Sequence, residues 1–253
     1  MNEETRFPRV GGPSYLTFLD AVHRLMAFGW YLEIGCRTGR TIAPVRGPTI
    51  AVDPFFKIES NVIGPKPNLL LFQQKSDDFF ASRVLEKLGI RLSFAFLDGL
   101  HLFEYLLRDF INTEAHSRPE GVIALHDCVP FGEGMLTRDL ENLPRGAWTG
   151  DVWKLIPILQ SYRPDLKITV LNCEPTGLVL ISGLDPANTV LRQAYDQIVA
   201  DWADVDLVPY GLDRFFGSFA LTDARAYAKA GFADFRRVAR RPDTLKTPVP
   251  VSP

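Results

Sequence analysis

A carboxylate and two glycines follow one another at the end of an apolar run, and a second carboxylate ends the next run. These residues are Glu33, Gly35, Gly39 and Asp53. Glycine lets the backbone turn sharply and lets a ligand approach without a Cβ in the way. An acidic residue after the second strand of a nucleotide-binding sheet accepts hydrogen bonds from a ribose. The pattern predicts a site for a nucleotide-type cofactor.

Further polar residues follow two later apolar runs and could do proton or metal chemistry. Asp98 ends the run 93–98 and His101 follows it, whereas His126 ends the run 121–126 and Asp127 follows it. An imidazole titrates near neutral pH, so we predict His101 as a general base and His126 as an orienting or assisting group. Asp98 and Asp127 are the candidate ligands for a hard divalent ion such as Mg²⁺.

The metal pattern is incomplete at this stage. His126 and Cys128 flank Asp127, where a magnesium site would favour another carboxylate or amide. Imidazole and thiol suit a softer metal better. A metal requirement is therefore an open alternative to a purely organic base.

Short apolar runs alternate with helical patterns along the chain, which predicts a mostly parallel sheet covered on both faces. The runs 166–171 and 178–181 are joined by a tight turn, so they predict an antiparallel hairpin at the far edge. Pro44 disfavours a regular helix between the first two strands. The expected strands are 30–35, 48–53, 68–73, 93–98 and 121–126, and the expected helices are 14–28, 77–88, 101–116, 151–162 and 186–203.

The glycine pattern differs from the dinucleotide fingerprint, because Glu33 stands where the first glycine would be. A carboxylate there repels a pyrophosphate but can pair with a cationic or ammonium group. Over about residues 30–183, including the terminal hairpin, the chain resembles the class I S-adenosylmethionine-dependent methyltransferases. The closest match is the small-molecule branch with Asp-Gly-x-His after the fourth strand and His-Asp after the fifth, here Asp98 to His101 and His126-Asp127.

The resemblance implies a Rossmann-like, doubly wound α/β sheet of about seven strands, with helices on both faces. It implies methyl transfer to a small molecule, with oxygen the favoured acceptor atom, and S-adenosyl-L-methionine as cofactor. Asp53 would hold the ribose, and Asp77 would approach the adenine. The implied cofactor residues are Glu33, Gly35, Cys36, Arg37, Gly39, Asp53, Ser76, Asp77 and Asp98, and the implied catalytic residues are His101, His126 and Asp98.

Each of these residues also has a structural reading. Asp53 could be a turn residue, Ser76 and Asp77 could cap the next helix, and the two histidines could bond to backbone. Trp148 is a candidate to stack on the acceptor, whereas Trp153 begins an amphipathic pattern that is equally typical of packing. His23 and His116 are expected on the surface or at helix ends, and the aromatic group 215–219 is expected to pack, with a subunit contact open.

The composition limits the classes of function. The 253 residues contain 46% hydrophobic residues and carry a formal charge of -2, which fits one domain over 1–253 and disfavours nucleic acid or an anionic membrane as partner. The expected parts are the helix 14–28, the sheet core 30–183, a helical extension 186–240 and a loosely ordered tail 241–253. Three scattered cysteines predict neither a disulfide framework nor a zinc site. No leader pattern is seen, so a cytoplasmic location is expected, and a homo-oligomer remains open.

Three competing functions remain at this stage. A nicotinamide-dependent oxidoreductase would use a related sheet, and a metal-dependent hydroxylase would use the same fold. A third alternative is a protein that binds the cofactor without catalysis. The Glu33 position and the terminal hairpin count against the oxidoreductase, and the strand-end histidines count against a non-catalytic protein.

Overall fold

The apolar runs of the sequence form neighbouring strands of one sheet in the computed structural model, which describes residues 7–239. The sheet order is β3-β2-β1-β4-β5-β7-β6-β8, with β1 to β5 parallel to one another. The strands are β1 (Trp30–Ile34), β2 (Thr49–Val52), β3 (Leu69–Phe72), β4 (Leu92–Leu97), β5 (Ser117–His126), β6 (Lys167–Leu171), β7 (Leu178–Ser182) and β8 (Leu221–Thr222).

The predicted Rossmann-like α/β fold with a terminal hairpin is confirmed. β7 runs antiparallel to both β5 and β6, because the short connection between β6 and β7 has no room for a crossover. The sheet has one strand more than the seven expected, since the two-residue β8 pairs parallel with β6. β4 is fully buried, as the central strand of a sheet covered on both faces must be.

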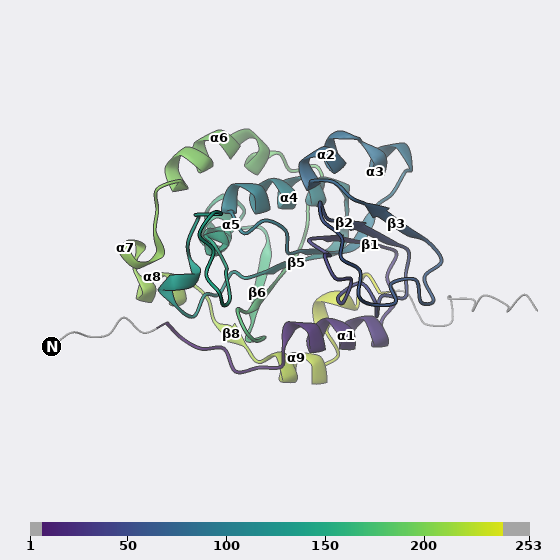
Figure 1. Cartoon of the computed structure of the whole chain (residues 1–253), viewed down its shortest axis with the longest axis horizontal. Coiled ribbons are helices and arrows are strands. Elements are labelled where there is room, and N and C mark those ends of the chain that lie inside the picture. The colour runs from purple at the N-terminus through teal and green to yellow at the C-terminus, as the bar shows by residue number, and fades with distance from the viewer. Residues whose placement is uncertain (1–6, 240–253) are drawn as a thin grey trace, which may run out of the picture.

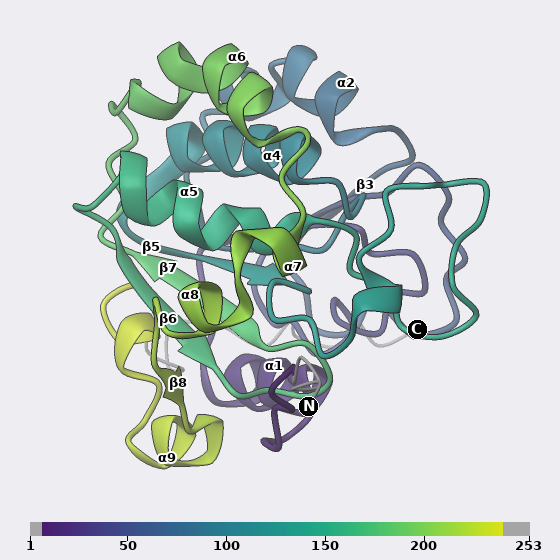
Figure 2. The same cartoon turned by 90° about the vertical axis from the view of Figure 1, so that its left-hand side faces the viewer.

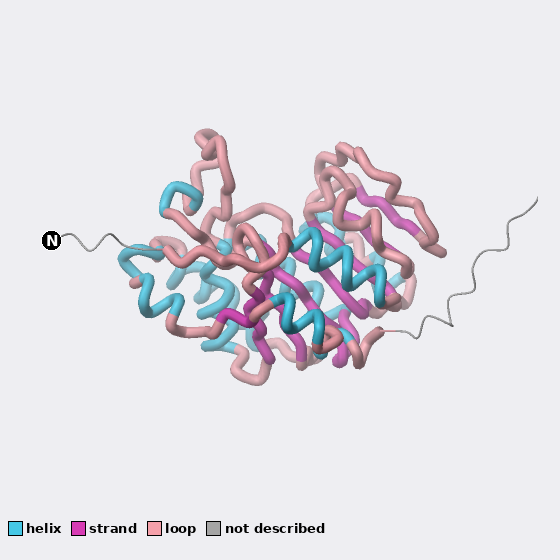
Figure 3. Tube along the Cα trace, turned by 90° about the horizontal axis from the view of Figure 1, so that it is seen from below, coloured by secondary structure: helices cyan, strands magenta, loops and turns pink. Residues whose placement is uncertain are grey.

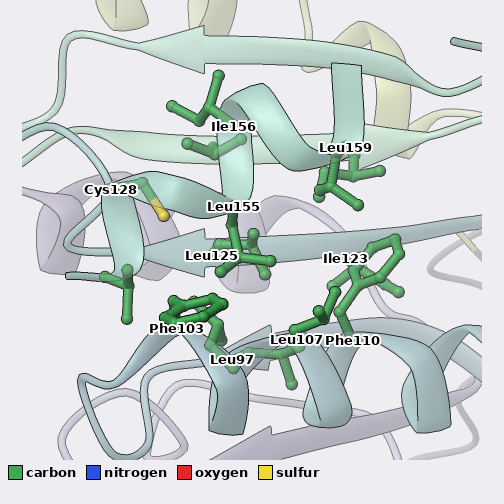
Figure 4. Packing of buried hydrophobic residues seen from close by; sticks show 14 of the residues in the cluster. Leu97, Phe103, Leu107, Phe110, Ile123, Leu125, Cys128, Leu155, Ile156 and Leu159 are labelled. Carbon is green, nitrogen blue, oxygen red and sulfur yellow. The ribbon is translucent and has the colours of Figure 1, made fainter. Parts of the chain in front are cut away.

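One face of the sheet is covered by most of the helices (Figure 1). Leu97, Ile123 and Leu125 of the strands meet Phe103 and Phe110 of α4 in this layer (Figure 4). The helices of this face are α2 (Ser76–Ala81), α3 (Val84–Lys87), α4 (Phe103–His116), α5 (Leu155–Tyr162) and α6 (Val190–Trp202), with α7 (Leu207–Tyr210) and α8 (Leu212–Phe216) beside them. The segment 77–88, expected as one helix, is divided between α2 and α3, and Arg83 between them has a left-handed backbone.

The opposite face has fewer helices, and this accounts for the missing crossover helix between β1 and β2. α1 (Tyr15–Leu25) and α9 (Ala224–Lys229) lie on this face (Figure 2). Phe18 and Val22 of α1 pack with Ile42 and Val45 of the β1–β2 connection, which consists of turns. α1 therefore covers the surface that a crossover helix would otherwise cover. Its predicted N-cap is confirmed, because Ser14 Oγ accepts a hydrogen bond from the Thr17 backbone.

Several expectations about single residues have clear outcomes. His23 was expected at the surface or at a helix end, and it does lie in the last turn of α1. It is fully buried, however, among Phe28, Tyr31 and Phe94. It lies on the inner stripe of α1, one position after Val22. His116 does lie at the end of α4, and the predicted tail 241–253 lies outside the described residues. Within residues 7–239, no helix has the length and apolar character that a membrane crossing requires.

Candidate active site

A cavity of about 690 Å³ lies over the carboxyl ends of the parallel strands, at the point where the strand order reverses between β1 and β4. This is where ligands bind in open α/β sheets. The volume falls within the range of about 300–1,000 Å³ that is typical of small-molecule sites. Its lining includes predicted residues from four segments: Gly35, Arg37, Asp53, Ser76, Asp77, Asp98 and His101. Loops rise from this edge of the sheet on two sides (Figure 3).

The turn after β1 brings the ends of β1 and β4 into direct contact. Gly35 has φ +90°, and a Cβ on it would lie 1.8 Å from the carbonyl oxygen of Asp98. Only glycine fits this position, because both the backbone conformation and the contact exclude a side chain. The turn thereby fixes the start of the Asp98 loop against the mouth of the cavity.

Asp53 joins the ends of β1 and β2. Its Oδ2 accepts a hydrogen bond from the Arg37 backbone at 2.8 Å, and its Oδ1 accepts one from the Phe55 backbone at 2.7 Å. Both oxygens keep a further lone pair, since an ionised carboxylate offers about four acceptor sites. Asp53 also lines the cavity. It is therefore held in place and still able to accept hydrogen bonds from a diol.

Glu33 does not line the cavity, which corrects the prediction that it pairs with a cationic ligand. It is fully buried and accepts hydrogen bonds from the Tyr31 hydroxyl at 2.6 Å and from the Thr41 hydroxyl. Burial raises the pKa of Glu33 to about 7. The residue fastens the turn from behind, on the face of β1 that carries Tyr31.

Cys36 and Gly39 have structural contacts in place of the predicted cofactor contacts. The Cys36 thiol is buried and donates to the Glu33 carbonyl at 3.2 Å. Gly39 has φ +78°, and a Cβ on it would lie 2.5 Å from the Val62 side chain. Neither residue lines the cavity, so both shape the turn that presents Gly35 and Arg37.

Asp77 lines the cavity after β3 but already forms an ion pair. Arg108 of α4 donates to both of its oxygens, at 2.9 and 2.8 Å. The sequence reasoning missed Asp109, which lines the cavity from the next position of α4. The available signal was a carboxylate beside Phe110 on the buried side of the helix, where polar residues are rare.

Asp98, His101, His126 and Asp127 converge into one cluster, as the strand-end argument predicts. His101 Nε2 lies 3.4 Å from Asp98 Oδ1 and 3.2 Å from Asp127 Oδ2. His126 Nδ1 lies 3.2 Å from Asp98 Oδ1 and 3.3 Å from Asp127 Oδ2. Each carboxylate thus faces both imidazoles.

His101 is the histidine that lines the cavity. Its Nδ1 lies 2.7 Å from the Trp148 carbonyl, so Nδ1 carries the proton and Nε2 points toward the carboxylates. The Trp148 indole lies against the imidazole, with ring centroids 4.8 Å apart, and donates from Nε1 to the Thr137 carbonyl. Trp148 therefore orients His101, which is a different task from the predicted stacking on an acceptor.

His126 lies behind the cluster, where the predicted orienting role fits. It is 6% exposed, does not line the cavity, and lies against the tilted Tyr15 ring with centroids 3.9 Å apart. Burial lowers the pKa of His126, but the carboxylates of Asp127 and Asp98 outweigh it and raise the pKa to about 10. A cationic His126 then neutralises part of the charge of the two carboxylates.

The same cluster has the donor set of a divalent metal site. Ligand atoms of Asp98, His101 and Asp127 all lie within 4.8 Å of one another. Asp127 has a left-handed backbone, φ 59°, and its Oδ1 accepts a hydrogen bond from Thr176 at 2.6 Å. Two fixed carboxylates and one oriented imidazole suit a divalent ion and leave coordination positions open.

The third candidate ligand is thus His101, whereas Cys128 takes no part in the cluster. The Cys128 thiol is fully buried in the core and donates to the His126 carbonyl at 3.3 Å. Cys128 points into the packed layer of Figure 4, because the chain turns at Asp127.

The loop after β5 is fastened to the His101 segment. Asp151 accepts a hydrogen bond from the Phe103 backbone at the start of α4, at 2.9 Å, and pairs with Arg138 and with the buried Lys154. The Asp151 backbone donates to the His101 carbonyl at 3.3 Å. Trp153, which also lies in this segment, is buried in the core, as the packing interpretation predicts.

No protein-family model and no curated protein matches this chain. Solved structures do resemble it. Cofactor-bound Rv0187 from MTB superimposes with a TM-score of 0.50 at 14% identity, over 72% of this chain and 84% of that chain. The O-methyltransferase TomG from Streptomyces achromogenes, solved with SAM, gives 0.47 at 17% identity, over 66% and 78%. An O-methyltransferase from Bacillus cereus, solved with SAH, gives 0.45 at 14% identity, over 69% and 83%. At these identities the likeness concerns the fold alone.

Proposed function

We propose that this chain is an S-adenosyl-L-methionine-dependent methyltransferase that methylates an oxygen of a small-molecule acceptor. The sequence motifs, the sheet order with its terminal hairpin and the cavity at the strand ends all support this function. The likeness to Rv0187, a structure with a bound cofactor, agrees with a fold that binds a cofactor.

The observation that carries the proposal is that one cavity joins a diol-binding carboxylate to an acid–base cluster. Asp53 lines the cavity near the end of β2, and Asp98 and His101 line it after β4. The sheet order places β1 between these two strands. A nucleoside held through its ribose at Asp53 can therefore extend along the Gly35 turn and present its reactive end to His101.

The residues of this chain that bind the cofactor follow from the cavity lining. Asp53 would accept hydrogen bonds from the ribose hydroxyls, and the turn from Gly35 to Arg37 would hold the amino-acid part. The bound cofactor supplies a methyl group on a positively charged sulfur. The carboxylate of Asp98, close to that end, provides a favourable electrostatic environment for the positive charge.

The acceptor reacts at the His101 end of the cavity. The bound cofactor would supply the methyl group to the acceptor oxygen here, and Nε2 of His101 would take the proton that the acceptor hydroxyl loses. Asp98 and Asp127 stabilise the imidazolium that results, because each lies within 3.4 Å of that nitrogen. Alignment of the two reactants supplies a large share of the acceleration, and the base adds about 10²–10⁴-fold.

A divalent ion is a specific alternative for the same atoms. Asp98, His101 and Asp127 would hold it, and it would supply Lewis acidity toward the acceptor hydroxyl. Nε2 of His101 cannot bind a metal and accept a proton at once. Turnover that survives exhaustive chelation assigns His101 as the base, and turnover that is lost and returns with Mg²⁺ assigns it as a ligand.

Calorimetry with S-adenosylhomocysteine and with NAD tests the function directly. We expect the wild-type chain to bind S-adenosylhomocysteine and to give no heat with NAD. Asp53→Ala should weaken binding at least tenfold, because the ribose loses its acceptor, whereas the exposed Asp78→Ala should bind as the wild type does. Heat with NAD alone would favour an oxidoreductase, and no heat with either ligand from folded protein would reject the proposal.

Activity is then tested with labelled S-adenosylmethionine and a panel of hydroxylated small molecules. His101→Ala should lose turnover and keep the affinity for S-adenosylhomocysteine, since His101 contacts the acceptor end. A chain that binds the cofactor and methylates no member of a broad panel would support the non-catalytic alternative.

A further inference from the structure

A loop after β5 projects above the cavity and carries two strongly exposed leucines. We call residues 136–147 the cap loop, which is the teal loop at the right of Figure 2. The backbones of Thr149 and Gly150 both donate to the Met135 carbonyl, at 2.9 and 3.0 Å. The Trp148 indole donates to the Thr137 carbonyl at 2.8 Å. The two ends of the cap loop are therefore held together, and they position its tip.

An ion-pair network fixes the cap loop near His101. Arg138 donates to both carboxylate oxygens of Glu104, at 3.1 and 2.7 Å, and pairs with Asp151. Glu104 lies in the first turn of α4, three residues after His101. The Asp151 backbone also donates to the His101 carbonyl. Leu140 follows Arg138 by two residues and lines the cavity, and these contacts place it at the His101 end.

Leu140 is held with much of its side chain uncovered. It is 48% exposed, although it lines the cavity. Asp139 fixes the backbone on either side of it, because its Oδ1 accepts a hydrogen bond from the Glu141 backbone at 2.9 Å and its Oδ2 accepts one from the Asn142 side chain at 2.7 Å. A ligand that covers this leucine removes apolar surface from water without first having to order the loop.

The charges at the His101 end disfavour an anionic acceptor. The carboxylates of Asp98 and Asp127 both lie within 3.4 Å of His101 Nε2, and Arg138 already pairs with two other carboxylates. Leu100, next to His101, is 38% exposed and also lines the cavity. A carboxylate or phosphate on the acceptor would therefore face like charges and lose its hydration against leucine side chains.

We propose that Leu140 contacts the acceptor and that the acceptor is an uncharged hydroxyl compound with an apolar body. The proposal rests on the proposed function, because it assumes that the acceptor reacts at His101. The apolar body covers Leu140, and the hydroxyl group lies at Nε2 of His101. Leu140 is in this way a residue that determines specificity for the acceptor and has no part in binding the cofactor.

Binding of two phenols to the protein saturated with S-adenosylhomocysteine tests the proposal. The probes are 4-propylphenol and 3-(4-hydroxyphenyl)propionate, which have the same hydroxyl group and differ at the far end, where the second carries a carboxylate. Titration followed by saturation-transfer NMR measures both affinities. The wild-type complex should bind 4-propylphenol with a millimolar Kd, the usual range for a ligand of about ten heavy atoms, and at least about tenfold more tightly than the propionate.

Three variants of the cap loop separate the role of Leu140 from that of the loop. Leu140→Ala should weaken the binding of 4-propylphenol about tenfold, because it removes three carbons that the ligand covers in part. Leu140→Met keeps an apolar side chain of similar volume and should bind as the wild type does. Leu143→Ala is the matched control, since Leu143 is 45% exposed on the same loop and lies outside the cavity lining. All three should keep the wild-type melting temperature and affinity for S-adenosylhomocysteine.

The outcomes separate this proposal from the proposed function. It is overturned if the wild-type complex binds the two phenols equally, prefers the propionate or binds neither. Equal weakening by Leu143→Ala and Leu140→Ala would also overturn it, because the effect would then belong to the loop as a whole. A parallel loss of S-adenosylhomocysteine affinity in Leu140→Ala would place Leu140 over the cofactor instead. Folded wild-type protein that does not bind S-adenosylhomocysteine would reject the proposed function itself.

Discussion

Replacing His23 by leucine should change how the stability of the protein depends on pH. His23 is fully buried in α1, and neither ring nitrogen has a hydrogen-bond partner within the described residues. Its neighbours are the rings of Phe28, Tyr31 and Phe94. Burial without a partner lowers the pKa of His23 from 6.5 to about 3.

The size of the effect follows from this shift. Unfolded His23 binds a proton below pH 6.5, whereas folded His23 stays neutral until about pH 3. The stability of the wild type therefore falls as the pH is lowered through this window. One pH unit corresponds to ~1.4 kcal/mol, so this histidine costs ~2 kcal/mol of stability at pH 5 relative to pH 7. Leucine does not titrate and removes that loss.

Urea unfolding of the wild type and His23→Leu at pH 5 and pH 7 provides the measurement. The difference in unfolding free energy between the two proteins should shift by ~2 kcal/mol in favour of leucine on going from pH 7 to pH 5. Effects of leucine on packing are the same at both pH values and cancel. Glu33 and Asp109 also titrate here but are present in both proteins. An equal difference at both pH values would refute the assignment of a buried, neutral imidazole.

Three further outcomes follow from the site. Gly35→Ala should lose at least ~2 kcal/mol of unfolding free energy, because the added Cβ would collide with the Asp98 carbonyl and the backbone has a positive φ. It should also lose most of its affinity for S-adenosylhomocysteine, and a urea midpoint equal to that of the wild type would contradict the structure. The unfolding free energy of Asp109→Asn relative to wild type should rise by a few kcal/mol between pH 4 and pH 8, because the wild-type carboxyl, with a pKa of about 7, must ionise while buried. Urea unfolding at both pH values would show no such rise if Asp109 were solvated. If the cluster holds a divalent ion, Mn²⁺ titration followed by electron paramagnetic resonance should find one site that Asp127→Asn loses and the exposed Asp139→Asn keeps. Equal binding by both variants would exclude the cluster as the metal site.

The strand ends could be predicted from the sequence because the signals for them are local. A fully buried strand reads as an apolar run, and glycine or aspartate marks its end. The parallel order then places Gly35, Asp53 and Asp98 at one edge, without any knowledge of side-chain packing. All three line the cavity. The hairpin of β6 and β7 was equally accessible, since its connection is too short for any other pairing.

Side-chain directions and partners were harder to predict, because they depend on residues far away in the sequence. Glu33 alternates with Leu32 and Ile34 and shares a face of β1 with Tyr31, so its carboxylate points away from the cavity. The alternation of side chains along β1 predicts this direction for the Glu33 carboxylate, whereas the glycine motif alone predicts only the turn. The engagement of Asp77 depends on Arg108, 31 residues later, which no local pattern indicates.

His23 and Asp109 show why an unpaired buried group needs its surroundings to be interpreted. Both are polar and almost fully buried, and both ring nitrogens of His23 and the Oδ1 atom of Asp109 have no hydrogen-bond partner within the described residues. His23 lies between aromatic rings away from the cavity, and because its pKa is lowered to about 3 it is neutral at pH 7. Asp109 lines the cavity, and burial raises its pKa to about 7 although a hydrogen bond from Ser76 opposes the shift, so its ionisation near neutral pH costs stability. Removing His23 should therefore raise stability at low pH and leave cofactor affinity unchanged. Removing Asp109 should raise stability at high pH, and an opposite pH dependence of the two variants would mean that burial does not set the two pKa values.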